Sequence, residues 1–504
     1  MRIEPTGDGF KEVYQSGRPT VVWTTAVADL ETPVAAYMKL CGTRDHSLLL
    51  ESVEGGATRG RYSIIGFDPD LVFRAEGERG FINRRFAADP TAFEPVEGRA
   101  FDALKTLIHD SQFSLPAGLP PMSAGIFGYL GYDMVRQMEQ LGLPNPDPIG
   151  LADAVLVRPR TVLVFDSVKD EITIVTQVRP EPGISAEDAY ARAVDRLTAV
   201  VDDLDRAVDK SLEPADLSLH VPVKSNTTPD DYMKMVETAK DYIAAGDIFQ
   251  VVLSQRFEAP FALPPFSLYR ALRRVNPSPF LYFLDFGSYS IAGSSPEILV
   301  RVRDGEVTIR PIAGTRPRGK SAEEDKANAN DLLADPKELA EHLMLLDLGR
   351  NDVGRVSEIG SVKVTEKFFL EYYSHVMHIV SNVVGKLASD KDVLDALAAG
   401  FPAGTVSGAP KVRAMEIIDE LEKEKRGLYA GCVGYFSADG AMDTCICLRT
   451  ALVKDGTIYA QAGAGIVADS VPASEQAECG NKAGALFRAA EEAVRFANQA
   501  RRGQ

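Results

Sequence analysis

Two pairs of glutamates at helical spacing are the residues best suited to carry chemistry. Glu338 and Glu341 lie three apart in a Leu-, Ala- and Glu-rich segment, and Glu475 and Glu478 lie three apart near the end of the chain. Residues at this spacing share one face of a helix. Carboxylates from two helices suit Mg²⁺, which prefers oxygen ligands and keeps water or substrate oxygens in its shell. The alternative is two solvated acidic faces, with Lys482 paired to Glu478 one turn away.

A glycine pair and a nearby arginine are suited to holding a carboxylate. The segment Gln-Ala-Gly-Ala-Gly-Ile-Val places Gly463 and Gly465 where no side chain blocks the backbone N–H groups. Arg449, in Cys-Leu-Arg-Thr, offers a planar bidentate donor, and its alternative role is an ordinary ion pair. The glycines do not form a dinucleotide-binding fingerprint, because the third glycine and an immediately following helix are missing.

One short motif points to a different class of enzyme. Residues 314–321 read Gly-Thr-Arg-Pro-Arg-Gly-Lys-Ser and match the P-loop pattern, with Asp347 as a candidate magnesium ligand. A P-loop follows a central strand and cradles phosphate with N–H groups, whereas Pro311 interrupts the preceding strand and Pro317 removes a donor. Asp347 falls in a segment with the composition of a helix. A P-loop NTPase is therefore the disfavoured alternative from a different class.

Hydrophobic periodicity and turn residues predict the elements that must position these groups. Strands are expected at 47–51 and 161–165, and a helix at 186–206. The later helices are expected at 231–246, 323–348, 390–400, 410–424 and 474–498. The later strands are expected at 249–257, 280–285, 290–302, 306–312, 430–437, 444–453 and 457–462. The polar stretch 214–228 predicts a linker between an N-terminal region, 1–213, and a catalytic region, 229–504.

Composition narrows the class of protein. The 504 residues are 45% hydrophobic and 25% charged, which is typical of a globular chain of two or three domains. The formal net charge of −17 argues against nucleic acid as a partner. Residues 1–10 lack the apolar core of a signal peptide, and no apolar run reaches the roughly 18 residues of a membrane-spanning helix. With five cysteines and no CxxC pair, a cytoplasmic protein without a membrane partner is expected.

Taken together, four longer blocks resemble the chorismate-utilising enzymes, and within them the anthranilate synthase component I family. The blocks are residues 312–319, 341–352, 401–411 and 461–482, and the similarity extends from about residue 47 to the C-terminal helix. Several long motifs in the right order are more specific than any single short pattern. The resemblance implies an α+β fold of two large, mostly antiparallel β-sheets packed face to face, with helices on the outside.

The resemblance also implies a reaction and the residues that carry it. The family makes anthranilate and pyruvate from chorismate and ammonia, with Mg²⁺ as cofactor. By their places in the motifs, Glu341 and Glu478 would be the metal ligands. Glu297 would be the general acid for the departing C4 hydroxyl, because a carboxyl kept protonated by burial can act near neutral pH. His378 would assist pyruvate elimination. The substrate contacts would be Gly314, Thr315 (also counted as catalytic), Tyr429, Arg449, Gly463, Ala464, Gly465 and Lys482.

This chain differs from other enzymes of the chorismate-utilising group at Gln250, at Ala313 and at Cys479-Gly480. Isochorismate and salicylate synthases, which add water, have a Lys base where this chain has Gln250. Aminodeoxychorismate synthases attack the ring with a Lys where this chain has Ala313, which cannot be a nucleophile. Both positions favour attack by ammonia, and an aminodeoxychorismate or aminodeoxyisochorismate synthase stays open as the alternative within the family. After Glu478 the family commonly has Thr and a longer polar residue, whereas this chain has Cys479-Gly480.

The resemblance further implies a feedback site and a second subunit. Ser52 would bind tryptophan through its hydroxyl, with Pro279, Phe280 and Leu281 around the indole. The sequence contains no Gly-x-Cys-x-Gly elbow of a glutamine amidotransferase, so a separate glutaminase subunit is expected to supply ammonia. By resemblance the assembly would be a heterotetramer. A binding module without catalytic activity is the remaining alternative.

Overall fold

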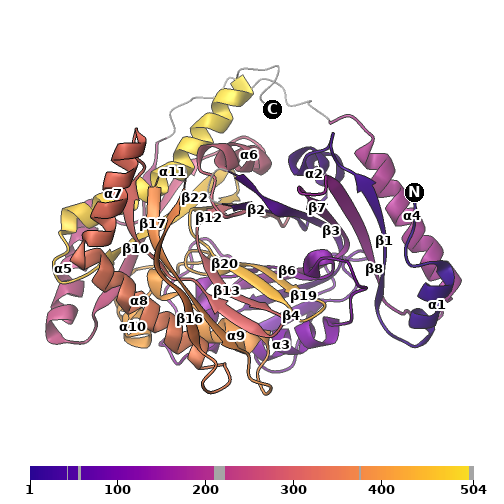
Figure 1. Ribbon diagram of the computed structural model, residues 1–504, viewed down its shortest axis with the longest axis horizontal. Helices are drawn as coiled ribbons and strands as arrows, with labels where there is room; N and C mark the ends of the chain where they lie inside the picture. Colours follow the sequence, from indigo (N-terminus) through magenta and orange to yellow (C-terminus); the bar gives the residue numbers. More distant parts are fainter. Residues whose placement is uncertain (43, 55–57, 209–221, 374–375, 499–504) are drawn as a thin grey trace.

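Helices flank the β-structure on its outer sides. The computed structural model describes residues 1–42, 44–54, 58–208, 222–373 and 376–498 (Figure 1). The α-helices are α1 (Gly7–Gln15), α2 (Pro33–Cys41), α3 (Ala100–Ser111), α4 (Ala186–Leu204), α5 (Pro229–Ala245), α6 (Pro265–Val275), α7 (Ala322–Ala334), α8 (Pro336–Gly354), α9 (Val393–Gly400), α10 (Lys411–Leu421) and α11 (Pro472–Asn498). Short 3₁₀ helices are η1 (Pro121–Ser123), η2 (Tyr132–Gln137) and η3 (Gly404–Val406).

One layer of antiparallel strands joins the two halves of the sequence. Its order is β10 (Gln250–Pro260), β22 (Thr457–Ile466), β21 (Thr450–Lys454), β12 (Tyr289–Ser295), β11 (Phe280–Asp285) and β2 (Ser47–Glu54). Two short strands, β9 (Lys224–Ser225) and β18 (Gly408–Ala409), also pair with β10. The strand β2 comes from the N-terminal part of the chain, yet it pairs directly with β11, so the two regions share one layer.

A second antiparallel layer contains the remaining catalytic-region strands. Its order is β6 (Gly125–Leu130), β19 (Cys432–Ser437), β20 (Met442–Ile446), β13 (Ile298–Arg303), β14 (Glu306–Ile309) and β17 (Val376–Lys386). Two further strands, β15 (Ile312–Pro317) and β16 (Lys363–Tyr372), pair with β17. Here too an N-terminal strand, β6, pairs with a C-terminal strand, β19.

Two long strands connect the layers into one hydrogen-bonded network. They are β3 (Thr58–Glu76) and β7 (Ala154–Asp166), which pair with each other. The strand β3 pairs with β2 of the first layer, and β7 pairs with β6 of the second. The outer strands on this side are β1 (Thr20–Val27), β8 (Glu171–Val178), β4 (Arg79–Asn83) and β5 (Glu94–Pro95).

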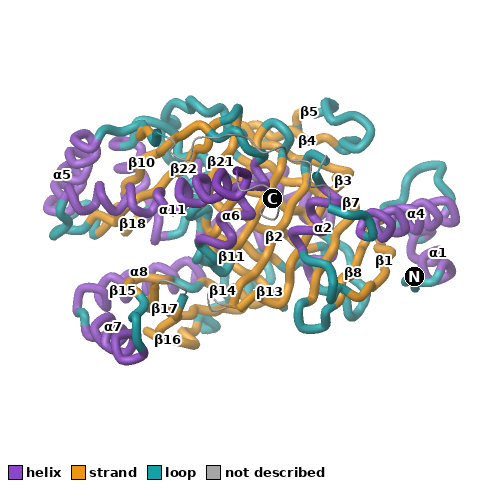
Figure 2. Tube along the Cα trace, turned by 90° about the horizontal axis from the view of Figure 1, so that it is seen from above, coloured by secondary structure: helices purple, strands orange, loops and turns teal. Residues whose placement is uncertain are grey.

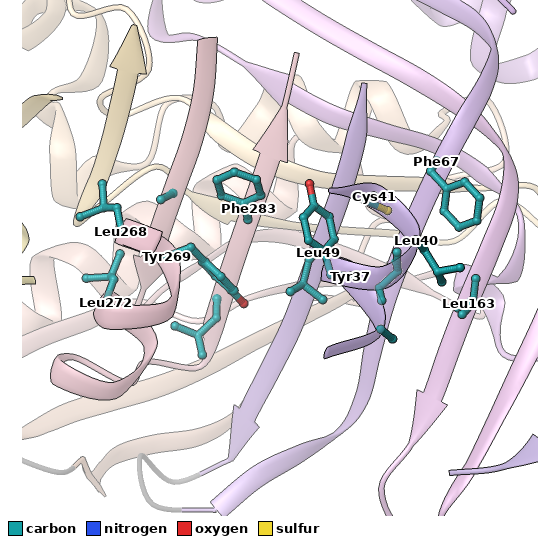
Figure 3. Packing of buried hydrophobic residues seen from close by; sticks show 14 of the residues in the cluster. Tyr37, Leu40, Cys41, Leu49, Phe67, Leu163, Leu268, Tyr269, Leu272 and Phe283 are labelled. Atoms are coloured by element: carbon teal, nitrogen blue, oxygen red, sulfur yellow. The ribbon is translucent and has the colours of Figure 1, made fainter. Parts of the chain in front are cut away.

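Three hydrophobic clusters hold the layers and helices together. One lies between the two layers and combines Leu48, Tyr282 and Leu452 of the first with Tyr129 and Val433 of the second. A second cluster packs α2, α4, α6 and α11 on the first layer. Figure 3 shows the part of it between α2 and α6, with Phe283 of β11. A third packs α3, α8 and α9 on the second layer. The sheets therefore pack face to face with helices outside, as the resemblance implied, and burial of this apolar surface is the main stabilising term.

Several expected elements are interrupted by proline. The expected helix 323–348 is two helices, because Asp335 caps α8 by accepting N–H groups of its first turn and Pro336 starts it. The expected strand 290–302 breaks between β12 and β13 at Pro296, and the strand 306–312 breaks before β15 at Pro311. The expected strand 444–453 breaks as well, although it contains no proline. Arg449 therefore lies between β20 and β21 rather than within a strand.

The structure rules out the P-loop interpretation. Residues 314–317 lie in β15 and pair with β17, with Thr315 opposite His378, and so do not form a phosphate-cradling loop. Asp347 lies on α8, is exposed and pairs with Arg350, as expected for a helical surface residue.

The expected linker lies partly outside the described residues. Of the stretch 214–228, residues 222–228 are described, and β9 within them pairs with β10. The division into regions 1–213 and 229–504 stays a prediction, and the shared layers mean that their strands interleave. Among the described helices, none combines the length and apolar character that crossing a membrane requires.

Candidate active site

A cavity of about 200 Å³ brings together most of the residues predicted to act on substrate. It lies where β10 and β22 meet β15, β17 and α11. In Figure 2, α11 and β22 lie on one side, and β15 and β17 with α7 and α8 lie on the other. The predicted residues in its lining are Glu297, Thr315, His378, Tyr429, Arg449, Gly463, Gly465 and Lys482.

Glu297 is a buried carboxyl held in the break between β12 and β13. Its side chain accepts a hydrogen bond from the hydroxyl of Thr405, at 3.2 Å from either oxygen. Burial raises the pKa of Glu297 to about 8, and the hydroxyl of Thr405 and the backbone N–H of Ile312 only partly oppose this effect. The carboxyl is therefore protonated at neutral pH, which is the state that a general acid requires.

His378 faces the same cavity as a neutral imidazole. Its Nδ1 lies 3.0 Å from the carbonyl oxygen of Gly314 and 3.0 Å from the hydroxyl of Thr315, across the β15–β17 pair. Burial lowers the pKa of His378 to about 4; the guanidinium of Arg449 adds to this effect, and the hydrogen bond to the Gly314 carbonyl partly opposes it. With Nδ1 donating to the Gly314 carbonyl, Nε2 is the acceptor and can take a proton.

Two cations line the cavity, and only one of them has a carboxylate partner. Arg449 makes no ion pair within the described part of the chain, and burial lowers its pKa. Its backbone φ of 46° is left-handed, a conformation that is uncommon for residues other than glycine, asparagine and aspartate. Lys482 donates to the Gly463 carbonyl at 2.9 Å and pairs with Glu478 at 2.7 Å. Lys482 therefore forms the ion pair expected on a helix surface and also lines the cavity, as expected of a substrate-binding residue.

The two predicted glycines lie on β22 where larger residues would not fit. A Cβ on Gly463 would lie 2.7 Å from the hydroxyl of Tyr429, and one on Gly465 would lie 2.5 Å from Nε2 of Gln250. Beyond Ala460 the strand no longer pairs with β21, so that edge of β22 faces the cavity. Backbone groups can therefore approach a ligand here, as the glycine spacing suggested.

The predicted metal ligands have the donor chemistry of a magnesium site. Glu341, on α8, accepts a hydrogen bond from Gln250 at 3.1 Å. Burial raises the pKa of Glu341, and the carboxylates of Glu338 and Glu478 raise it further, so a cation between them would relieve repulsion. Glu338 pairs with Arg316 at 2.9 Å and Glu478 pairs with Lys482 at 2.7 Å, so a cation at Glu341 and Glu478 would share Glu478 with Lys482. The described residues contain no cluster of three or more metal-ligating side chains, so water and substrate oxygens would complete the shell.

Two predicted substrate residues do not line the cavity with their side chains. Ala464 is fully buried and packs with α5 and α10, because alternate residues of a strand face opposite sides. Gly314 has a φ of 73°, and its carbonyl oxygen accepts a hydrogen bond from Nδ1 of His378, which does line the cavity. The role of Thr405, whose hydroxyl contacts Glu297, was missed, although it lies within the block 401–411 that carried the resemblance.

A separate cavity of about 120 Å³ contains most of the predicted tryptophan residues. Ser52, Phe280 and Leu281 line it, together with Tyr282 and side chains of the second layer, whereas Pro279 is not in the lining. Phe280 lies opposite Ser52 on β2 and opposite Ser295 on β12. This cavity and the larger one share no lining residue.

Comparison with known proteins assigns the chain to a family. Residues 45–488 match the family described as chorismate binding enzyme. Anthranilate synthase component 1 of Cereibacter sphaeroides is 56% identical over 98% of this chain and 99% of that protein. The protein of the same name from Pseudomonas aeruginosa is 49% identical over 92% and 94%. The crystal structure of anthranilate synthase component I from Streptococcus pneumoniae is 42% identical, covers 92% of this chain and 99% of that chain, and superposes with a TM-score of 0.75.

The fold and the matched region define a chorismate binding enzyme. Within that class, the chain belongs to the family of anthranilate synthase component 1. The menaquinone-specific isochorismate synthase from Escherichia coli shares the fold, with a TM-score of 0.69 at 19% identity. The family, the α+β fold and the class of enzyme indicated by the motifs are thus confirmed, and the binding-module alternative is wrong.

Proposed function

We propose that this chain converts chorismate and ammonia to anthranilate, pyruvate and water in aromatic amino acid biosynthesis. The observation that carries the proposal is a protonated buried carboxyl, Glu297, in one cavity with a neutral imidazole and an arginine that has no carboxylate partner in the described residues. Two acid–base groups in opposite protonation states suit a reaction that both adds and removes protons.

The side chains support a division of roles along the reaction. Arg449 and Lys482 would bind the carboxylates of chorismate, with help from backbone groups of Gly463 and Gly465. Ammonia would form a C–N bond at ring C2 while Glu297 gives its proton to the departing C4 hydroxyl, which leaves as water. His378 would then take the C2 proton through Nε2 as the enolpyruvyl group leaves and the ring becomes aromatic. The methylene carbon of the leaving group gains a proton to give pyruvate, and the new ammonium group returns a proton to the Glu297 carboxylate.

Magnesium is part of the same proposal. Glu341 and Glu478 would hold the ion, whose positive charge would bind and neutralise the ring carboxylate of chorismate. Gln250 would orient Glu341 through the hydrogen bond between them.

The cysteines support the expectation that ammonia comes from a second subunit. All five are buried, and burial raises the pKa of every one of them, to about 11 for Cys479 and about 12 for Cys432. None is therefore a thiolate that could hydrolyse glutamine. Relatives named component 1 support a partner component, for which we propose a glutamine amidotransferase in a heterotetramer. Buried, unpaired thiols also fit the cytoplasm as the compartment.

Feedback inhibition by tryptophan is the last part of the proposal. The indole would lie against Phe280 and Leu281 in the smaller cavity, with the hydroxyl of Ser52 binding the amino acid. The strand β11 gives this cavity a direct connection to the active site, because Phe280 pairs with Ser295, two residues before Glu297. Tryptophan should inhibit the wild-type chain, and Ser52→Phe, which fills the cavity, should keep activity and lose inhibition. Equal inhibition of both proteins would contradict this site.

The function is tested by anthranilate fluorescence with the purified chain, chorismate, Mg²⁺ and an ammonium salt. The wild-type chain should produce a signal that EDTA abolishes. Glu297→Gln should reduce the rate by about 10²- to 10⁴-fold, the usual contribution of a positioned general acid. Glu358→Gln is the matched control, because Glu358 is exposed and its one ion pair among the described residues is with the exposed Lys386. Equal loss in both variants, or no signal from the wild type, would contradict the proposal.

A further inference from the structure

A large cavity lies at the opposite end of the molecule from the candidate active site. It has a volume of about 850 Å³ and is bounded by α4, β7, the end of β8 and the loop after β4. Figures 1 and 2 both show α4 and β8 at the far end from β10 and β17. Its lining shares no residue with the active-site cavity or the proposed tryptophan cavity. A ligand here would therefore be separate from both.

The lining of this cavity is strongly basic in a chain that is acidic overall. Seven arginines and three carboxylates line it, a surplus of four positive charges, while the whole chain has a net charge of −17. Arg158 and Arg160 lie two apart on β7 and share a face of the strand. Arg192 and Arg196 lie one turn apart on α4, where like charges repel. Arg179 directly follows β8.

Most of these guanidinium groups make no ion pair within the described residues. Of the seven, only Arg158 has a carboxylate partner there: Asp70, at 2.8 and 3.0 Å. Arg179 donates to the backbone carbonyl of Ser111 at 3.0 Å, and its buried Nε has no hydrogen-bond acceptor among the described atoms. Because that Nε has no accessible surface, the donors open to a ligand are those of accessible lining arginines such as the exposed Arg192.

Two of the partly buried arginines feel the surplus of positive charge. Burial and the guanidinium of Arg158 lower the pKa of Arg179 to about 10, although nearby carboxylates partly oppose this. Burial and the neighbouring Arg160 lower the pKa of Arg196 to about 10, which Glu181 partly opposes. Both groups stay charged at neutral pH, and the carboxylates offset only part of the repulsion among the arginines.

We propose that this cavity binds a small anion carrying two or more phosphate or carboxylate groups. Guanidinium forks match the oxygens of both groups and bind them bidentately. The volume is that of a site for a metabolite rather than for a single phosphate.

The test is isothermal titration calorimetry of the full chain with tripolyphosphate and with citrate, in 150 mM NaCl to screen loose surface binding. Arg160→Gln and Arg192→Gln remove lining charges whose side chains have no hydrogen bond or ion pair in the described structure. Each should weaken binding about tenfold or more, as expected for a lost charge-assisted hydrogen bond. Arg206→Gln is the matched control: Arg206 follows α4, its side chain is 74% exposed, and within the described residues its ion pair is with Asp203, so binding should change less than about twofold.

Each outcome decides the proposal. Saturable binding of either probe that weakens in both cavity variants supports it, and the preferred probe distinguishes phosphate from carboxylate ligands. Three results would overturn it. The first is no saturable binding of either probe, and the second is probe binding that the cavity variants leave unchanged. The third is that the cavity variants bind both probes as the wild type does but bind a partner subunit more weakly. The last result would make the cavity a protein contact.

Discussion

Glu297→Gln isolates the protonation state on which the proposed chemistry depends. The side chain of Glu297 is 6% exposed, and its pKa is raised from 4.5 to about 8. Gln preserves the shape of the side chain and its contact with Thr405 but cannot ionise. Any difference in pH dependence between the two proteins therefore reports the titration of this one carboxyl.

The sign and size follow from proton linkage. Between pH 4.5 and about 8, the folded chain keeps a proton on Glu297 that the unfolded chain has lost. The free energy of unfolding then falls as pH rises, by about 1.4 kcal/mol for each pH unit. Over the whole window the loss is about 5 kcal/mol, and above pH 8 both states are ionised and the loss stops. Glu297→Gln should show none of this slope.

The assay is urea unfolding of both proteins at pH 5.5, 6.5 and 7.5. The other titrating groups are common to both proteins and cancel in the difference. The unfolding free energy of the variant minus that of the wild type should rise by roughly 1.4 kcal/mol for each unit of pH increase. A difference in unfolding free energy that stays constant across the three pH values would refute the reasoning, since it would mean that Glu297 is ionised in the folded chain.

Three further substitutions and one control test the packing in and beside the site. Glu422→Gln leaves the fully buried guanidinium of Arg426 without its carboxylate and should cost about 3–5 kcal/mol by urea unfolding. The control, Glu492→Gln, removes a partly exposed carboxylate whose partner Arg495 is exposed, and it should cost less than about 1 kcal/mol; equal losses would contradict this. Gly463→Ala would place a Cβ 2.8 Å from a backbone carbonyl, so kcat/KM for chorismate should fall at least about tenfold; unchanged kinetics would be inconsistent with the cavity. Gly480→Ala meets no atom within 4 Å and should raise the unfolding free energy by up to about 1 kcal/mol; a decrease would show hidden strain.

Residue types and spacing predicted much of the site because helical and strand periodicity are local. The helices α5, α10 and α11 lie where their patterns placed them, and β11 begins and ends at the expected residues. Burial raises the pKa of Glu297 to about 8, which is the direction that the predicted general acid needs; its role stays a prediction. The break before α8 was also readable, because Asp335-Pro336 is a helix-start signal inside the expected helix.

Other features depend on contacts between distant segments. Ala464 was expected to contact substrate, but β22 continues to Ile466 and its alternation turns that side chain away. The left-handed backbone of Arg449 has no signal in the residue type. The basic cavity joins arginines from β7, β8 and α4 that each look like ordinary surface residues in sequence, so only the fold reveals their convergence.

The stoichiometry of a single reaction tests the central claim most directly. The full chain would be mixed with chorismate, Mg²⁺ and an ammonium salt, and chorismate consumed, pyruvate released and anthranilate formed would be measured together. We predict equal amounts of all three. Chorismate consumed to an aminated product without pyruvate would indicate an aminodeoxychorismate or aminodeoxyisochorismate synthase. It would contradict the proposed role of His378 in completing the elimination.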